Sequence, residues 1–298
     1  MCLRAGTAAA LLTVLGPVAG CGTRAEPLRL AAGEPGGFYA EFGRLLASAL
    51  RSAGRPTEEL STGGSVDNVS RVRAGTAQVG LALADVAAAP EATGLLALGR
   101  VYQNYLQLVV RAGDRATRLA DLTGRPVSVG NVGSGAALTA ARLLDLTGVR
   151  VERVSLPLRD AVAALVGGQV DGVLFSGGVP TPALTEVGAG LRLLDLGEEA
   201  VALRERWGEV YRTVRVPVGA YGTEGRLSTV GVSNLLLARA DLPDATAAQV
   251  VDVLLDDAGD LVPSTALGTQ FLDQPSLVAV GSATLHPGAA AAYRRRHG

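Results

Sequence analysis

The sequence predicts an α/β protein made of two doubly wound lobes. Apolar runs of strand length alternate with amphipathic helical patterns, and this alternation occurs twice before a final segment returns toward the first unit. The longest runs lack the polar alternation of solvent-facing strands, which is typical of parallel strands that helices cover on both faces. About 270 residues follow the N-terminal segment, which is enough for two lobes with real cores.

The first unit is expected to begin with a strand over 28–32. Apolar residues then recur at i, i+3, i+4, i+7 and i+8 over 42–50, the pattern of an amphipathic helix. A second helix is expected over 66–72, and the continuous apolar run 77–83 predicts a buried parallel strand. Two further strands are expected, at 95–101 and 106–111.

The second unit repeats this order. Strands are expected at 126–130, 170–175 and 191–196, with helices that begin near 137 and 162. A long strand over 229–237 is expected to cross back to the first unit, followed by a helix over 247–254. This return predicts a first lobe formed by 28–111 together with 235–298, and a second lobe formed by 112–234.

Three Gly- and Ser-rich turns, at 33–43, 61–69 and 129–137, lie where an apolar run is followed by a helical pattern. A helix that begins after such a turn directs unpaired backbone N–H groups and the positive end of its dipole forward. Three such turns without a catalytic set beside them predict a pocket that binds a small anionic solute.

The N-terminus has the pattern of a secretory signal peptide, expected over 1–20. An apolar stretch over 8–18 is too short to span a bilayer and ends in Val18-Ala19-Gly20-Cys21. This ending resembles the lipobox of bacterial lipoproteins, in which the cysteine is lipidated. Residues 21–27 are then the lipid anchor and tether, and the protein is expected on the extracytoplasmic face of the cell membrane. The alternative is an ordinary cleavage site with a chance cysteine.

Composition argues against an enzyme. Every basic residue is arginine, so a P-loop lysine and a Schiff-base lysine are both excluded. His286 and His297 are the only histidines, and both lie near the C-terminus. The sequence therefore offers little support for a metal site or a Ser-His-Asp triad. The net charge is −1 and no basic block points to nucleic acid. We therefore expect a binding protein with no cofactor and no metal.

Seven segments resemble, in the expected order, the TAXI solute receptors of tripartite ATP-independent periplasmic (TRAP) transporters. They are AAGEPGGFYAEFGRLLASAL, TGGSVDNVSRVRAGTAQVGLALADV, VYQNYLQLVVR, LTGRPVSVGNVGSGA, VDGVLFSGGVPTPAL, STVGVSNLLLAR and LHPGAAAAY. The resemblance implies a type II periplasmic-binding-protein-like fold, with a hinge and a ligand cleft between the lobes. It also implies capture of a small carboxylate, amino-acid-like or a dicarboxylate, for the subunits of a membrane permease. A ligand-sensing lipoprotein that signals to a membrane receptor kinase is the alternative.

The resemblance also implies a set of ligand-binding residues. Asp85 is the one that would hold a ligand ammonium group, and Ser134 has little structural need for a hydroxyl before a helix. The implied set is Gly36, Gly37, Tyr39, Ser65, Asn68, Asp85, Ser134, Gly135, Gly178, Pro180 and Tyr221.

Structural roles compete with some of these assignments. Tyr39 and Tyr102 are alternatively core aromatics, Asn68 alternatively bonds its own turn, and Asp85 is alternatively a helix N-cap. The chain also departs from the family pattern at three positions near the expected cleft, which are Phe38, Asn104 and Ala136.

Overall fold

A computed structural model describes residues 26–222 and 226–297 of the chain. The predicted signal peptide at 1–20 and the predicted lipid attachment site Cys21 lie outside the described residues. Within the described part, no helix has both the length and the apolar character needed to cross a membrane.

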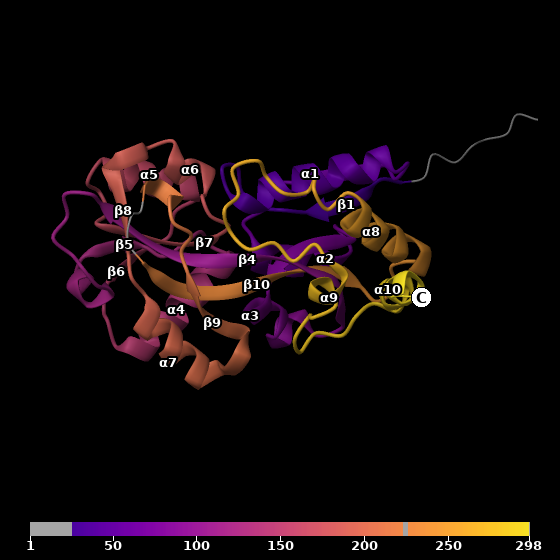
Figure 1. Cartoon of the computed structure of the whole chain (residues 1–298). Helices are drawn as coiled ribbons and strands as arrows, with labels where there is room; N and C mark the ends of the chain where they lie inside the picture. The colour runs from indigo at the N-terminus through magenta and orange to yellow at the C-terminus, as the bar shows by residue number, and fades with distance from the viewer. Residues whose placement is uncertain (1–25, 223–225, 298) are drawn as a thin grey trace, which may run out of the picture.

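The strands form one continuous sheet that extends through both halves of the molecule (Figure 1). Its order is β2-β1-β3-β10-β4-β7-β5-β6, with β8 paired to β4 and β9 paired to β10. The right half in Figure 1 contains β1 (Leu28–Ala31), β2 (Thr57–Leu60) and β3 (Val79–Leu83). The left half contains β5 (Pro126–Ser128), β6 (Glu152–Val154), β7 (Gly172–Gly177), β8 (Leu191–Leu194) and β9 (Tyr211–Arg215).

Two long antiparallel strands connect the halves. They are β4 (Leu95–Arg111) and β10 (Ser228–Arg239), which pair with each other over most of their length. The far end of β4 then pairs with β7 and β8, while the start of β10 pairs with β9. The prediction of two separate strands in this region is wrong. The polar residues Gln103 and Asn104, which lie between the two predicted strands, are buried in the ladder opposite β10.

Helices cover both faces of this sheet. The right half carries α1 (Phe38–Ser52), α2 (Ser65–Ala74), α3 (Ala84–Ala87), α8 (Asp244–Asp256), α9 (Gln274–Leu277) and α10 (Pro287–His297). The left half carries α4 (Gly135–Thr147), α5 (Leu158–Val166), α6 (Pro182–Thr185) and α7 (Gly197–Trp207). Single 3₁₀ turns complete the described elements, at Pro90–Ala92, Leu119–Leu122, Gly188–Gly190, Gly208–Val210 and Ala220–Gly222.

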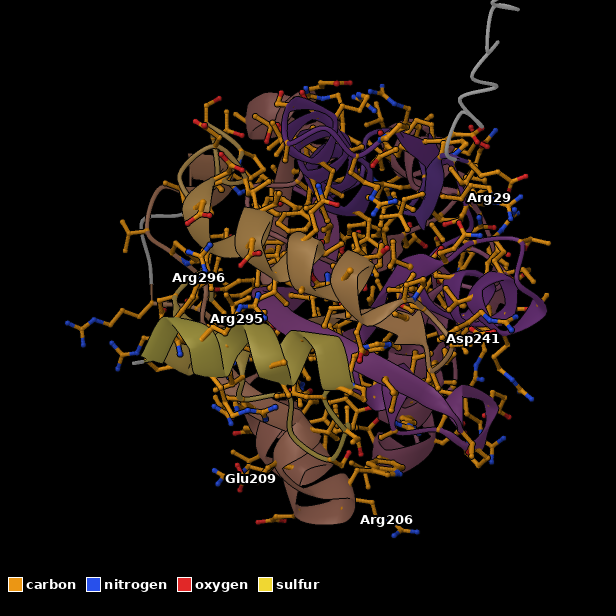
Figure 2. All side chains as sticks on the ribbon, turned by 90° about the vertical axis from the view of Figure 1, so that its right-hand side faces the viewer. Arg29, Arg206, Glu209, Asp241, Arg295 and Arg296 are labelled. Atoms are coloured by element: carbon orange, nitrogen blue, oxygen red, sulfur yellow. The ribbon has the colours of Figure 1, made fainter. Side chains whose placement is uncertain are left out.

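The apolar face of α1 packs into the core of the right half. Phe42, Leu46 and Leu50 repeat at helical spacing, are fully buried, and belong to one cluster with residues of α8. The C-terminal helix closes this half from outside, as Figure 2 shows from the right-hand side of Figure 1. There Arg296 of α10 forms ion pairs with Asp252 and Asp256 of α8. The helices α8 and α10, which follow β10, therefore pack together on the right half.

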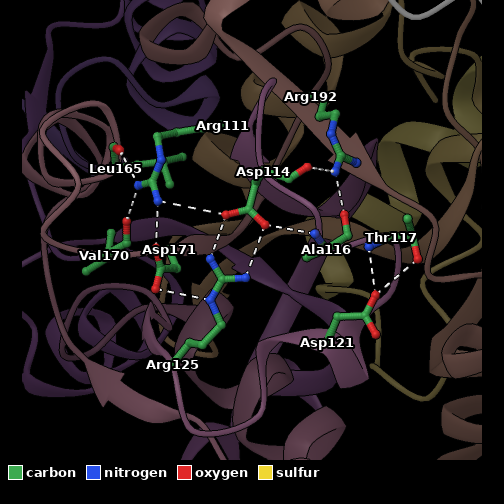
Figure 3. A network of polar contacts seen from close by, with 10 residues as sticks. All are labelled: Arg111, Asp114, Ala116, Thr117, Asp121, Arg125, Leu165, Val170, Asp171 and Arg192. Carbon is green, nitrogen blue, oxygen red and sulfur yellow. Dashed lines mark hydrogen bonds and ion pairs between the residues drawn. The ribbon is translucent and has the colours of Figure 1, made fainter.

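A network of charges lies at the end of β4 in the left half (Figure 3). Arg125 donates to both carboxylate oxygens of Asp114, at 3.1 and 2.6 Å, and to Asp171 at 3.1 Å. Arg111 also pairs with Asp171 at 2.6 Å and donates to two backbone carbonyl oxygens, those of Leu165 and Val170. This network joins the end of β4 to the starts of β5 and β7.

Candidate functional site

A cavity lies between the two halves, at the turns that follow the strands. It has a volume of about 400 Å³, including its open mouth. All three Gly-rich turns identified in the sequence contribute to its wall. The lining residues are Gly33, Glu34, Gly37, Phe38, Tyr39, Gly63, Gly64, Ser65, Leu83, Asn104, Ser134, Gly135, Ala136, Phe175, Ser176 and Gly177.

The first turn is shaped by its own sequence. Gly37 N–H donates to the carbonyl oxygen of Glu34 at 3.1 Å, with Pro35 and Gly36 between them. Gly36 has φ of +83°, which a type II turn requires at its third position and which glycine adopts without strain. The helix α1 begins directly after this turn. Gly36 itself supports the turn and does not line the cavity, whereas Gly37 does.

The helices α1 and α4 both begin at the cavity wall, from opposite halves of the molecule. The first N–H groups of a helix have no partner within it. Ser134 is the N-cap of α4, and its Oγ accepts a hydrogen bond from Ala137 N–H at 3.1 Å. The expectation that this hydroxyl lacks a structural role is therefore wrong, because it satisfies one of these donors. Its own proton is free to point elsewhere.

The second turn, at 61–69, is bonded to the third turn by backbone hydrogen bonds. Val66 N–H and Asp67 N–H, in the first turn of α2, donate to the carbonyl oxygen of Gly133 at 3.0 and 3.1 Å. Gly133 belongs to the third turn, on the other half. These two donors of α2 are therefore occupied by the protein itself and hold the two turns together across the cavity.

Close approach of the turns depends on Gly135. A Cβ atom at this position would lie 2.7 Å from both the Leu83 Cδ1 atom and the Ser65 Oγ atom. Contacts this short force a neighbouring side chain to shift, so a larger residue would displace Leu83 or Ser65 where α4 meets β3 and α2. Gly135 thus lines the cavity and sets the distance between its walls.

Tyr39 and Ser65 meet inside the cavity wall. The Tyr39 hydroxyl donates to Asn234 Oδ1 at 2.9 Å and lies 3.0 Å from Ser65 Oγ. Ser65 Oγ also accepts from Leu83 N–H at 3.1 Å. Burial raises the pKa of Tyr39 well above its usual value, so the phenol stays neutral. Tyr102 is a core aromatic, because its ring packs among Phe38, Tyr39 and Phe42.

Asn68 is buried beside the cavity and does not line it. Its Nδ2 donates to the carbonyl oxygens of Ala32 and Leu81, both at 2.7 Å, and its Oδ1 accepts from Thr62 Oγ1 at 2.6 Å. The amide therefore joins the ends of β1 and β3 to α2. Its hydrogen bonds reach beyond its own turn.

Asp85 lies outside the cavity, in the first turn of α3, and is fully buried. Its Oδ2 accepts from Thr139 Oγ1 at 2.9 Å and from the Tyr211 hydroxyl at 2.8 Å, with Arg142 at 3.8 Å. The N-cap of α3 is Leu83, so the alternative of Asp85 as N-cap is wrong. Burial raises the pKa of this carboxyl, against the lowering by its hydrogen bonds and by Arg142.

The remaining predicted residues lie behind the wall that β7 forms. Gly178 packs against the ring of Phe38, and Pro180 follows it in the loop that leads to α6. The Tyr221 hydroxyl donates to Gln107 Oε1 and accepts from Thr181 N–H, both at 2.5 Å. Burial raises the pKa of Tyr221 to about 12. These residues hold the loop after β7, and none of the three lines the cavity.

The structure adds residues that the resemblance did not supply. Glu34 lines the cavity, and its Oε2 accepts from Leu158 N–H at 3.0 Å, at the start of α5 on the other half. Burial raises its pKa. Among the described residues, Glu34 is the only acidic or basic side chain in the lining. Ser176 and Phe175 of β7 also line it. Glu34 sits inside the first Gly-rich turn, so its position was a usable signal.

The fold is that of periplasmic binding proteins, as comparison with solved structures shows. One described as a periplasmic transporter is 17% identical, with 79% of this chain and 85% of that chain covered and a TM-score of 0.53. The GluR0 ligand-binding core in complex with L-glutamate is 16% identical, covering 78% and 92%, with a TM-score of 0.50. The arginine-, lysine-, histidine-binding protein ArtJ from Geobacillus stearothermophilus is 11% identical, covering 79% and 92%, with a TM-score of 0.52.

Residues 30–296 match the NMT1-like family, and the chain belongs to it. The prediction of a two-lobe α/β protein of the periplasmic-binding type is confirmed. The names of these similar structures describe binding and transport by those proteins. In the described residues, no group of three or more His, Cys, Asp or Glu side chains is arranged to hold a metal ion.

Proposed function

We propose that this protein is an extracytoplasmic solute-binding lipoprotein that captures a small carboxylate for a TRAP-type permease. One observation carries the proposal. The N-termini of α1 and α4 come from opposite halves and meet at one cavity. Each supplies unpaired N–H groups and the positive end of a helix dipole, which together stabilise an anion.

The rest of the lining suits a small carboxylate held without a basic side chain. Ser65 and Ser134 supply hydroxyl groups beside the helix ends, whereas the Tyr39 hydroxyl donates its proton to Asn234. If the solute also carries an ammonium group, Glu34 is the carboxylate placed to bind it, because Asp85 does not line the cavity. The similar structures named for glutamate and for arginine, lysine and histidine support an amino-acid-like solute.

Capture requires the halves to separate and close. We propose that residues 28–111 with 235–298 move against 112–234, with β4 and β10 as the hinge. These two strands are the longest in the described chain and connect the halves. The contacts of Gly133 with α2 and of Glu34 with α5 form only when the halves meet. Attachment through Cys21 and delivery to a permease follow the family resemblance.

Isothermal titration calorimetry of the purified mature chain tests the binding role. The panel contains small monocarboxylates, dicarboxylates and amino acids, each with its neutral amide or alcohol analogue. We expect a carboxylate to bind and its uncharged analogue, with the carboxylate replaced, to bind at least tenfold more weakly. Tight binding of a solute without any carboxylate would refute the proposal. Cross-linking in membranes then separates a permease partner from a receptor kinase.

A further inference from the structure

Two polar side chains on the wall of the cavity lack hydrogen-bond partners. Asn104 is 1% exposed, and neither its Oδ1 nor its Nδ2 has a partner among the described residues. The Oγ atom of Ser176 is likewise buried and unpartnered in the described structure. Both residues line the cavity.

The two side chains lie on the same face of adjacent strands. Leu106 of β4 is opposite Ser176 of β7, and Asn104 is two residues before Leu106. Side chains two residues apart in a strand point to the same face. Asn104 and Ser176 therefore form one polar patch on the sheet side of the cavity.

Buried polar atoms in native proteins are nearly always paired, and an unpaired one costs stability. Neither polar atom of the Asn104 amide is paired, and the amide lies at a cavity wall. This indicates that a bound molecule supplies the hydrogen-bond partners. An amide offers two donors and an acceptor, and a hydroxyl offers one donor and acceptor sites. A group that both donates and accepts satisfies this patch.

A second carboxylate satisfies it poorly. A carboxylate only accepts, so Asn104 Oδ1 would remain without a donor.

We propose that Asn104 and Ser176 recognise an uncharged hydrogen-bonding group at the far end of the solute, a carboxamide or an alcohol. The inference rests on the proposed function, because the solute's carboxylate is bound by the ends of α1 and α4. The protein is therefore selective for a carboxylate with a neutral polar end over a dicarboxylate of the same length.

Calorimetry with four compounds of similar length tests this selectivity. They are succinamate, 4-hydroxybutyrate, succinate and butyrate. We expect succinamate or 4-hydroxybutyrate to bind about tenfold more tightly than both succinate and butyrate, the effect of one to two hydrogen bonds. In Asn104→Leu this preference should fall to within about twofold, while butyrate still binds.

A matched pair of serine variants provides the control. Ser128 Oγ in β5 is also buried and unpartnered in the described residues, but Ser128 does not line the cavity. Ser176→Ala should reduce the preference for a neutral polar end, whereas Ser128→Ala should leave it unchanged. The melting temperature of each ligand-free variant shows that the chain remains folded.

The possible failures are distinguishable. If succinate binds as tightly as succinamate in the parent, this inference is wrong and carboxylate capture stands. If Asn104→Leu keeps the full preference, the amide is satisfied by water alone and the inference is wrong. If none of the carboxylates here or in the wider panel binds, the proposed function fails as well.

Discussion

The Asp85 carboxylate accepts a 2.8 Å hydrogen bond from the Tyr211 hydroxyl, although the residues are 126 positions apart and belong to opposite halves of the molecule. Thr139 and Arg142 of α4 approach the same carboxylate oxygen. Burial raises the pKa of the Asp85 carboxyl. The contact between the halves therefore depends on whether this carboxyl is protonated.

We expect Asp85→Asn to flatten part of the pH dependence of stability. The folded-state pKa of Asp85 lies above its unfolded value of about 3.8. Asp85 therefore contributes most to the stability of the folded state below that unfolded value, and this contribution is lost as the pH rises through the folded pKa. Urea unfolding of parent and variant between pH 4 and pH 8 measures the difference. If the free energy of unfolding changes with pH equally in the parent and the variant, the pH dependence does not come from Asp85.

Asp114→Asn should lower stability at neutral pH by up to about 2 kcal/mol. The hydrogen bonds from Arg125 lower the pKa of Asp114 to about 2. This contribution is present above the unfolded pKa and disappears as the pH falls through about 2. Denaturant unfolding at pH 7 measures the loss of stability, and unfolding at pH 2 shows whether the difference between parent and variant decreases. Asp145→Asn, at an exposed pair with Arg153, is the control and should cost little.

Ser134→Ala should have two separable effects. The loss of the N-cap of α4 should cost about 1 kcal/mol of stability without any ligand. Loss of the hydroxyl beside the carboxylate should also weaken binding, on the order of tenfold. Ser134→Gly keeps a tolerated cap residue, so it should keep most of the stability while binding weakens equally. Unchanged calorimetric affinity in both variants would exclude a ligand contact.

Gly135→Ala should hinder closure more than folding. Its Cβ atom would lie 2.7 Å from Ser65 Oγ and from Leu83 Cδ1, where α4 meets the other half. We expect binding to weaken by more than about tenfold, together with a larger radius of gyration by X-ray scattering. Gly113→Ala, with no atom near the added Cβ, should behave like the parent. Unhindered closure of the Gly135 variant would count against the proposed motion.

Cys21→Ser should release the protein from the membrane or leave it unprocessed. The reason is that lipidation at Val18-Ala19-Gly20-Cys21 needs the thiol. Cell fractionation and labelling with a fatty-acid analogue measure the outcome. Retention of both the label and the membrane location in the variant would disprove the anchor.

Much of the fold was predictable because its signals are local. Apolar runs and helical spacing located most strands and helices, and Pro35 with Gly36 marked the first turn. The break predicted inside β4 was an error of the same local reasoning. Gln103 and Asn104 lie between the two apolar runs, yet the neighbouring strand β10 pairs with their backbone.

The site was predictable only in part. Gly37, Tyr39, Ser65, Ser134 and Gly135 were assigned from the sequence and line one cavity, although their roles in binding stay predictions. Glu34 and Ser176 were missed. Asp85 was assigned to a ligand, but it does not line the cavity, and its Oδ2 accepts from Thr139 and Tyr211.

The sequence by itself located the strands β1, β3, β5, β7, β8 and β10 and the turns that begin α1, α2 and α4, because periodicity and turn chemistry act over a few residues. Only the tertiary structure decided which of those turns still offers free N–H groups. The donors of Val66 and Asp67 are taken by Gly133 of another turn, whereas the cavity meets the ends of α1 and α4. Hydrogen-bond partners and burial depend on segments far apart in the chain, and no local pattern specifies them.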